Sequence, residues 1–297
     1  AASPAAASPA AAAALPRAFE LVGGGALPSM ALGTMGVGGG EMEGVLGAPW
    51  EAVDTAPTYK NEAAVGAALA RRGTARYVVA KVPRKAHTAD AVRTSLAESR
   101  RKLQVGRIDL LLLHWPDQLL EKGALAEVWR AMEAARAENE VVSLGVCNFS
   151  IAALRQLLAV AVVPPAVNQV ERHVALPQWG LVDFCARHGV VLQAHTPLGH
   201  GKREVLAHPA VVAVAAGAGL TPAQVLLAWN LRHRVAVAPK TSRRDRADEA
   251  LAVVGSGQLG AADMEKLDAI APPGRGREVR VVNPPFMSKP GPQGAKY

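Results

Sequence analysis

The sequence has little of the material from which cross-linked, membrane-spanning or metal-dependent proteins are built. Two cysteines, Cys147 and Cys185, are too few for a disulfide framework or a structural zinc site, and we expect both to be free thiols. No apolar run approaches the roughly 18 residues that cross a bilayer, so no transmembrane helix is predicted. No His-x-His or HExxH pattern occurs, which argues against a metal-dependent hydrolase, and we expect no metal site.

Aromatic residues are also scarce, at 4% of the chain, although the formal net charge is +8. Nucleic-acid binding typically needs a basic stripe with stacking aromatics, so this combination predicts no nucleic-acid partner. We expect most of the positive charge to be solvated surface. The basic cluster at 240–246 is the one we consider suited to a small phosphorylated ligand.

The two ends of the chain differ from the rest in composition. Residues 1–18 hold only Ala, Ser, Pro, one Leu and one Arg, which predicts a disordered tail. An alternative is the remnant of an organelle transit peptide; we expect a cytoplasmic protein, with a plastid or other organelle as that alternative. Residues 288–297 are expected to form a C-terminal tail, leaving 19–287 as a single domain.

Between the tails, short apolar runs alternate with stretches of helical periodicity. The predicted strands are 30–34, 52–56, 77–82, 108–115, 143–149, 165–170, 190–196 and 235–241. Strands and helices in alternation predict parallel strands covered by helices, and eight such units are the number in a closed (β/α)8 TIM barrel. The alternative, an open doubly wound sheet, is disfavoured because no G-x-G-x-x-G follows any strand.

In such a barrel the active site lies at the carboxyl ends of the strands. Polar residues occur at or just after these ends: Thr34, Asp54, Thr55, Tyr59, Lys81, His114, Asn148, Gln169, His195, Lys240 and Thr241. Four of them suit proton transfer. Lys81 is expected to lower the pKa of the Tyr59 phenol, Asp54 to supply the anion that a buried Lys81 needs, and His114 to hydrogen-bond a substrate oxygen.

The motifs around these residues resemble those of the aldo-keto reductases. They are D-T-A-P-T-Y-K-N-E at 54–62, A-K-V at 80–82, L-L-L-H-W-P at 111–116, G-V-C-N-F-S at 145–150, N-Q-V-E at 168–171 and A-P-K-T-S-R-R-D-R-A-D-E at 238–249. The resemblance implies a (β/α)8 barrel that binds NADPH in extended form. It also implies hydride transfer to a carbonyl carbon, with Asp54, Tyr59, Lys81 and His114 as the catalytic tetrad and Tyr59 as the acid.

The same resemblance implies the binding residues. Asn148 and Gln169 match residues that hold the nicotinamide carboxamide, His195 takes the position of the stacking aromatic, and Gly33 and Thr34 belong to the cofactor-binding set. Lys240, Thr241 and Arg246 match the group that binds the adenosine 2′-phosphate. Glu249 matches an acidic residue near the adenine. Trp115, together with His114, matches the substrate-binding residues of the pocket. A lysine and an arginine beside a hydroxyl suit a dianionic phosphate, which favours NADPH over NADH.

Three departures from the family pattern bear on activity. Histidine stands at 195 where the family usually has tyrosine, and Cys147 stands where serine is common. Only 19 residues, among them three consecutive glycines at 38–40, separate Thr34 from Asp54, which predicts a short first helix. The alternative to a carbonyl reductase is therefore an NADPH-binding regulatory or structural barrel with little turnover. We expect a monomer acting on a small-molecule carbonyl; small aldehydes, sugar aldehydes and ketosteroids all stay open as substrates.

Overall fold

The computed structural model describes residues 14–72, 76–254, 259–272 and 278–282. Eight parallel strands form its centre: β3 (Ala31–Gly33), β4 (Ala52–Asp54), β5 (Tyr77–Val82), β6 (Ile108–Leu113), β7 (Val141–Cys147), β8 (Val167–Glu171), β9 (Val191–His195) and β10 (Ala236–Ala238). They are hydrogen-bonded in sequence order. Parallel bridges from Met30 to Val237 and from Gly33 to Lys240 join β3 to the β10 side and close the barrel. The predicted (β/α)8 barrel is confirmed, and each strand overlaps its predicted run.

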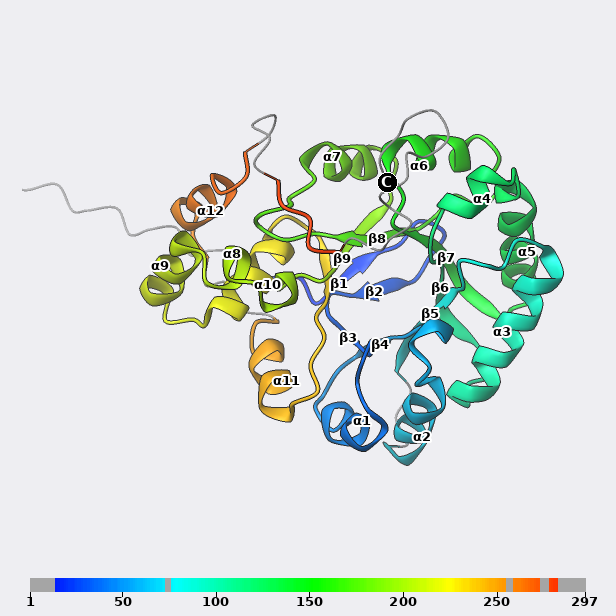
Figure 1. The fold of residues 1–297 in the computed structure, drawn as a ribbon, viewed down its shortest axis with the longest axis horizontal. Helices are drawn as coiled ribbons and strands as arrows, with labels where there is room; N and C mark the ends of the chain where they lie inside the picture. The colour runs from blue at the N-terminus through cyan, green and yellow to red at the C-terminus, as the bar shows by residue number, and fades with distance from the viewer. Residues whose placement is uncertain (1–13, 73–75, 255–258, 273–277, 283–297) are drawn as a thin grey trace, which may run out of the picture.

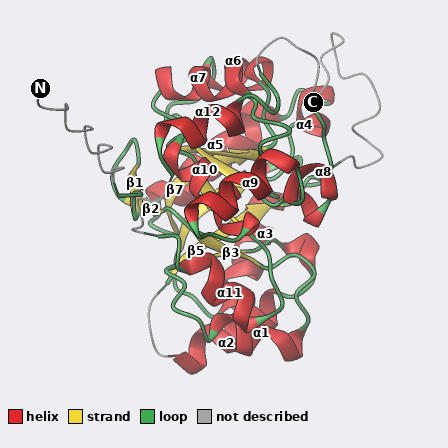
Figure 2. Cartoon of the chain, turned by 90° about the vertical axis from the view of Figure 1, so that its left-hand side faces the viewer, coloured by secondary structure: helices red, strands yellow, loops and turns green. Residues whose placement is uncertain are grey.

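Helices surround this barrel (Figures 1 and 2). They are α1 (Gly39–Leu46), α2 (Glu62–Arg72), α3 (Ala89–Leu103), α4 (Asp117–Glu121), α5 (Leu125–Ala137), α6 (Ile151–Leu158), α7 (Trp179–Arg187), α8 (Arg203–Leu206), α9 (Pro209–Ala218), α10 (Pro222–Arg232), α11 (Arg244–Leu251) and α12 (Ala261–Asp268), with short 3₁₀ turns η1 (Pro57–Tyr59) and η2 (Gly199–Gly201). The first barrel helix, α1, has eight residues, so the short first unit predicted from the spacing is present.

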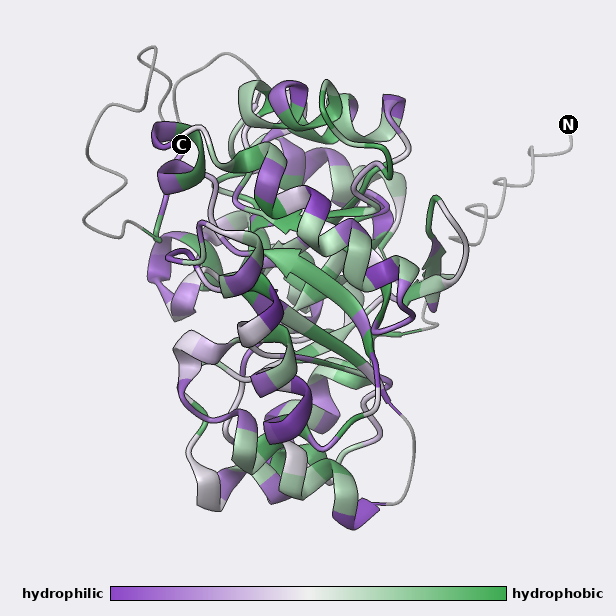
Figure 3. Cartoon of the chain, turned by 90° about the vertical axis from the view of Figure 1, so that its right-hand side faces the viewer, coloured by the Kyte–Doolittle hydropathy of each residue, from purple (hydrophilic) through white to green (hydrophobic). Residues whose placement is uncertain are grey.

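Local sequence explains where these elements begin and why the strands are buried. The Ser150 and Thr221 hydroxyls accept hydrogen bonds from backbone N–H groups in the first turns of α6 and α10, as N-caps do. The barrel strands are apolar almost throughout, and Figure 3 shows them as a hydrophobic interior within helices of mixed character. Because helices cover one side of each strand and the barrel interior the other, both faces need apolar residues.

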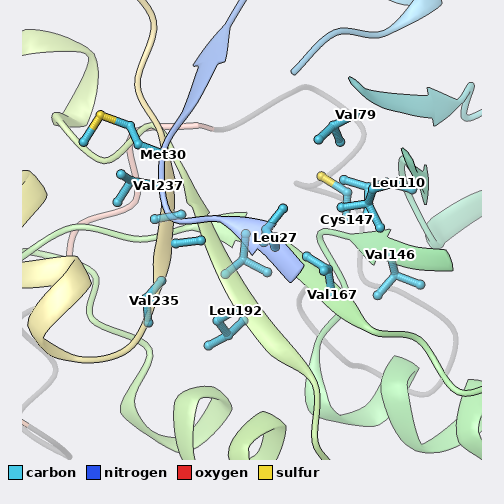
Figure 4. Close-up of a cluster of buried hydrophobic side chains, with 14 of the residues drawn as sticks. Leu27, Met30, Val79, Leu110, Val146, Cys147, Val167, Leu192, Val235 and Val237 are labelled. Carbon is cyan, nitrogen blue, oxygen red and sulfur yellow. The ribbon is translucent and has the colours of Figure 1, made fainter. Parts of the chain in front are cut away.

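A feature that the sequence analysis did not predict is an antiparallel hairpin of β1 (Ala18–Glu20) and β2 (Ala26–Pro28). Leu27 of β2 is fully buried, and Figure 4 places it beside Val167, Leu192 and Val235 at the inner side of the barrel. The hairpin therefore adds to the barrel core. Each of these strands buries a single residue, Phe19 or Leu27, so neither forms the apolar run by which the barrel strands were predicted.

The predicted tails overlap the described residues only in part. Residues 1–13 and 288–297 lie outside them. Within 14–18, Leu15 is buried at 4% exposure and the Arg17 carbonyl accepts a hydrogen bond from the Ser29 N–H (2.8 Å). The part of the chain that packs against the core therefore begins before residue 19, since the Leu15 side chain is buried in that core.

Among the described helices, none is by itself long and apolar enough to cross a membrane. One pair, α9 with α10, satisfies the length and composition criteria when the two are taken together across a 92° bend. In α10, the run from Val225 to Leu231 is buried inside the protein.

Candidate active site

Three neighbouring strands bring the predicted proton-transfer residues to one end of the barrel. Asp54 is the last residue of β4, Lys81 lies near the end of β5, and His114 directly follows β6. Tyr59 comes from η1, five residues after Asp54, where Lys60 ends the turn in the left-handed conformation. Parallel strands end at the same rim, so four residues spread over 61 positions of sequence meet in space.

The centre of this group is a buried ion pair. The Lys81 ammonium donates to Asp54 Oδ1 and lies 3.5 Å from the Thr55 carbonyl oxygen. The second carboxylate oxygen, Oδ2, accepts a hydrogen bond from Gln169 (2.6 Å). Burial by itself would lower the pKa of Lys81, but the adjacent Asp54 carboxylate, together with Tyr59 and Cys147, outweighs it and holds that pKa above its usual value. Lys81 therefore stays charged in the barrel interior.

Tyr59 lies against this pair. Its ring centroid is 5.3 Å from Lys81 Nζ, and its ring meets that of His114 edge to face at 6.0 Å. Burial raises the pKa of the phenol to about 12, and Lys81 only partly counters this by lowering it. Lys81 thus lowers the pKa as expected, but desolvation is the larger effect, so the net pKa lies above the free value.

His114 is buried, and its Nδ1 has no hydrogen-bond partner among the described residues. Burial lowers its pKa well below the usual value, and the nearby Lys81 charge acts in the same direction. The imidazole is therefore neutral at pH 7. Trp115, the next residue, is half-buried and stacks on the His114 ring with centroids 6.2 Å apart.

Three further predicted residues gather beside the tetrad from β7, β8 and β9. The Asn148 amide nitrogen donates to the His114 carbonyl oxygen (3.1 Å), and Asn148 Oδ1 lies 3.0 Å from His195 Nε2. The Gln169 amide nitrogen donates to Gln193 Oε1 (2.7 Å) as well as to Asp54. The Cys147 thiol is 3.7 Å from Gln169 Oε1, and burial raises its pKa to about 12, so it is protonated.

Comparisons with known proteins show the family of the chain. The sequence profile of the aldo/keto reductase family matches residues 30–272. The chain belongs to the aldo/keto reductase family.

The curated relatives include a glyoxal reductase of Bacillus subtilis, 34% identical over 74% of this chain and 79% of that protein. Glycerol 2-dehydrogenase (NADP(+)) of Hypocrea jecorina is 33% identical over 89% of this chain and 94% of its own. Among solved structures, an aldo/keto reductase from Brucella melitensis superposes with a TM-score of 0.80 at 28% identity, covering 86% of this chain and 99% of the other. Members of this family are oxidoreductases that act on small aldehydes or ketones with a nicotinamide cofactor.

In this aldo/keto reductase, the predicted phosphate-binding residues lie after β10, which adjoins β3 where the barrel closes. Lys240 and Arg246 are exposed and make no ion pair with any described carboxylate. Their neighbours differ: Arg243 pairs with Asp245, and Arg244 pairs with Asp248. Lys240 and Arg246 are thus the cations of this cluster without a partner among the described side chains, and Arg246 lies in the first turn of α11.

The remaining predicted cofactor residues occupy more enclosed positions. Gly33 donates its N–H to the Pro239 carbonyl oxygen (2.8 Å), and a Cβ there would lie 3.2 Å from two carbonyl oxygens of the β10 side, which explains the glycine. The Thr34 hydroxyl donates to the Asp54 carbonyl oxygen (2.9 Å). Glu249 accepts a hydrogen bond from the Thr221 hydroxyl, so its carboxylate lies at the contact between α10 and α11. The Thr241 hydroxyl accepts from the Arg243 N–H (3.1 Å).

Sequence reasoning missed Glu171, the last residue of β8. Its fully buried carboxylate lies 3.1 Å from His173 Nε2 and accepts from the N–H groups of Val281 (2.6 Å) and Val282 (3.2 Å), with Arg280 Nη1 at 3.4 Å. Glu171 pairs in register with His195, so residues 280–282 lie beside the barrel mouth. The N-Q-V-E motif could have indicated that Glu171 belongs to the site, because Gln169 and Glu171 are two residues apart on one strand and therefore face the same side.

Proposed function

We propose that this protein is an NADPH-dependent reductase that converts an aldehyde or ketone to the alcohol, with Tyr59 as the proton donor. The observation that carries the proposal is the placement of the Tyr59 ring against the Lys81–Asp54 pair at the mouth of the barrel. The phenol carries its proton at neutral pH, and the adjacent Lys81 ammonium favours the phenolate that forms when the proton is donated.

NADPH, when bound, would supply the hydride that reduces the carbonyl carbon. Tyr59 donates its proton to the carbonyl oxygen, and the Lys81 ammonium stabilises the phenolate that remains. Asp54 keeps Lys81 charged and fixed in place. His114, held neutral by burial, hydrogen-bonds the same oxygen, and Trp115 forms part of the wall beside it.

The donor set fits a nicotinamide cofactor. Both amide hydrogens of Gln169 are engaged by Asp54 and Gln193, whereas its Oε1 has only the weak thiol donor of Cys147. That acceptor suits a carboxamide N–H. Asn148 supplies a second side-chain amide beside that of Gln169. The half-buried His195 ring lies between the side chains of Asn148 and Thr196. Gly33 and Thr34 border the same end of β3.

The unpaired cations support NADPH over NADH. A dianionic 2′-phosphate would be bound by Lys240, the Thr241 hydroxyl and Arg246, close to the amino end of α11, where the helix dipole favours an anion. Arg243 and Arg244 already have carboxylate partners and contribute less. Glu249 would border the adenine. The relative from Hypocrea jecorina is itself described as NADP(+)-dependent.

Substitution of Tyr59 by phenylalanine tests the proposal. Tyr59→Phe keeps the ring that packs on His114 and removes the hydroxyl, so NADPH binding should be preserved while carbonyl reduction falls by about 10²- to 10⁴-fold. Binding is followed by cofactor fluorescence and turnover by loss of the reduced-nicotinamide absorbance. Unchanged turnover in Tyr59→Phe would refute the assigned role.

A further inference from the structure

The side chain of Asn148 is held from two directions. Its amide nitrogen faces the His114 backbone carbonyl (3.1 Å) and the Cys147 sulfur (3.1 Å), and its Oδ1 faces His195 Nε2 (3.0 Å). These contacts join the ends of β6, β7 and β9. Asn148 itself has a positive φ of 63°, a conformation that asparagine tolerates better than most residues.

The partners fix which atom carries each hydrogen. A carbonyl oxygen can only accept, so the Asn148 NH₂ group must face His114 and the Asn148 oxygen must face His195. His195 Nε2 must then carry a hydrogen. Burial lowers the pKa of His195 to about 3, so the ring is neutral and Nδ1 has no hydrogen. Nδ1 accordingly accepts from the Thr196 hydroxyl, which lies 3.0 Å away.

Thr196 provides a second, independent observation. It adopts a φ of 56°, in the left-handed region that β-branched residues rarely occupy. Residues are held in such conformations where the surrounding structure requires it, and they concentrate at functional sites. Here the unusual backbone brings the hydroxyl onto His195 Nδ1 and thereby fixes the tautomer that donates to Asn148.

We propose that His195 is a positioning residue that acts through Asn148: its Nε2–H holds the Asn148 amide in the orientation that receives the nicotinamide carboxamide. This rests on the proposed function. The resemblance to the family implies only an aromatic surface at 195, whereas a hydrogen-bond donor aimed at Asn148 is a property of this histidine. The Asn148 oxygen keeps a second lone pair for a carboxamide N–H of the cofactor.

Two substitutions separate a hydrogen-bonding role from a stacking role. His195→Phe keeps a ring and removes the donor, whereas His195→Gln keeps a donor of similar reach and removes the ring. The affinity for NADPH is measured by fluorescence titration, with each variant also made in an Asn148→Ala background. His188→Phe, an exposed histidine at the end of α7, serves as the matched control.

We expect His195→Phe to weaken NADPH binding about tenfold and His195→Gln by less than about threefold, since one hydrogen bond accounts for roughly this factor. In the Asn148→Ala background, His195→Phe should have almost no further effect. Binding retained by His195→Phe but lost by His195→Gln would overturn the proposal, as would an undiminished effect of His195→Phe without Asn148.

Wild type, His195→Phe, Asn148→Ala and the double variant are also compared by thermal unfolding without cofactor, which separates this inference from the proposed function. If wild-type protein fails to bind NADPH, the proposed function fails, and the unfolding series still decides whether His195 holds Asn148. Non-additive shifts in Tm for His195→Phe and Asn148→Ala would support the hydrogen bond, and additive shifts would overturn it.

Discussion

Lys81 and Asp54 form an ion pair inside the barrel in which the lysine side chain is 0% and the aspartate side chain 5% exposed. Neither charge could stay there alone, because water has been removed from both. The pair is completed by Gln169, which donates to the other carboxylate oxygen. The proposed catalytic site is therefore built on a contact that also contributes to folding.

Removal of one member of this pair should destabilise the protein. Asp54→Asn leaves the Lys81 charge buried without its counter-ion and should lower the free energy of unfolding by about 3 kcal/mol. The double variant Asp54→Asn, Lys81→Met removes both charges and should recover part of that loss. Urea denaturation measures both variants. A single variant as stable as wild type would show that water reaches Lys81.

The rate of reduction should be nearly independent of pH between about 6 and about 8. Tyr59 donates in its protonated form, which persists below its raised pKa of about 12. His114 and His195 have lowered pKa values, that of His195 about 3, so both rings stay neutral throughout this range. Turnover measured at saturating cofactor and substrate checks this. An inflection near the free histidine value of about 6.5 would mean that one of these imidazoles titrates in the working enzyme.

Loss of the unpaired cations should weaken binding of NADPH and not of NADH. Lys240→Ala and Arg246→Ala each remove one charge-assisted contact to the 2′-phosphate and should raise the Kd for NADPH about tenfold. Binding of NADH should change by less than about twofold. Arg130→Ala, on the exposed face of α5, controls for the change in net charge. Equal losses for the two cofactors would place the phosphate elsewhere.

Glu171 should fasten the segment 280–282 to the barrel. Glu171→Gln removes the negative charge and one of the two acceptor oxygens, so amide hydrogen exchange at Val281 and Val282 should accelerate about tenfold. Glu138→Gln, exposed at the end of α5, is the matched control. Unaltered exchange in Glu171→Gln would show that other contacts hold the segment.

The same carboxylate has a consequence for stability. Its hydrogen bonds and the nearby charges hold the pKa of Glu171 below its usual value despite burial. A lowered pKa contributes stability above the unfolded value of about 4.3, and that contribution is lost as the pH falls through the folded value. Acid unfolding of Glu171→Gln should therefore show a shallower dependence on pH than that of wild type.

The sequence was sufficient where the structure depends on strong, repeated patterns. Eight apolar runs separated by helical stretches predict the barrel. Because polar residues follow the ends of these runs, Asp54, Lys81 and His114 could be predicted from the sequence to lie together at the barrel mouth. The hairpin carrying Leu27 could not be predicted, because each of its strands buries a single residue, whereas even the three-residue barrel strands are buried throughout. The net rise in the pKa of Tyr59 could not be predicted, because desolvation depends on enclosure in three dimensions, which adjacency in the sequence does not report. Glu171 was missed because the backbone N–H groups that it binds, those of Val281 and Val282, lie about 110 residues away in the chain.

The measurement that tests the central claim most directly is the absorbance of reduced nicotinamide with purified protein, NADPH and a panel of aldehydes and ketones, repeated with NADH. The panel should begin with small polar carbonyls, because the relatives include a glyoxal reductase and a glycerol 2-dehydrogenase. The account predicts a carbonyl-dependent loss of signal that is faster with NADPH and absent in Tyr59→Phe. Binding of NADPH without turnover of any carbonyl would contradict it and would favour the regulatory barrel.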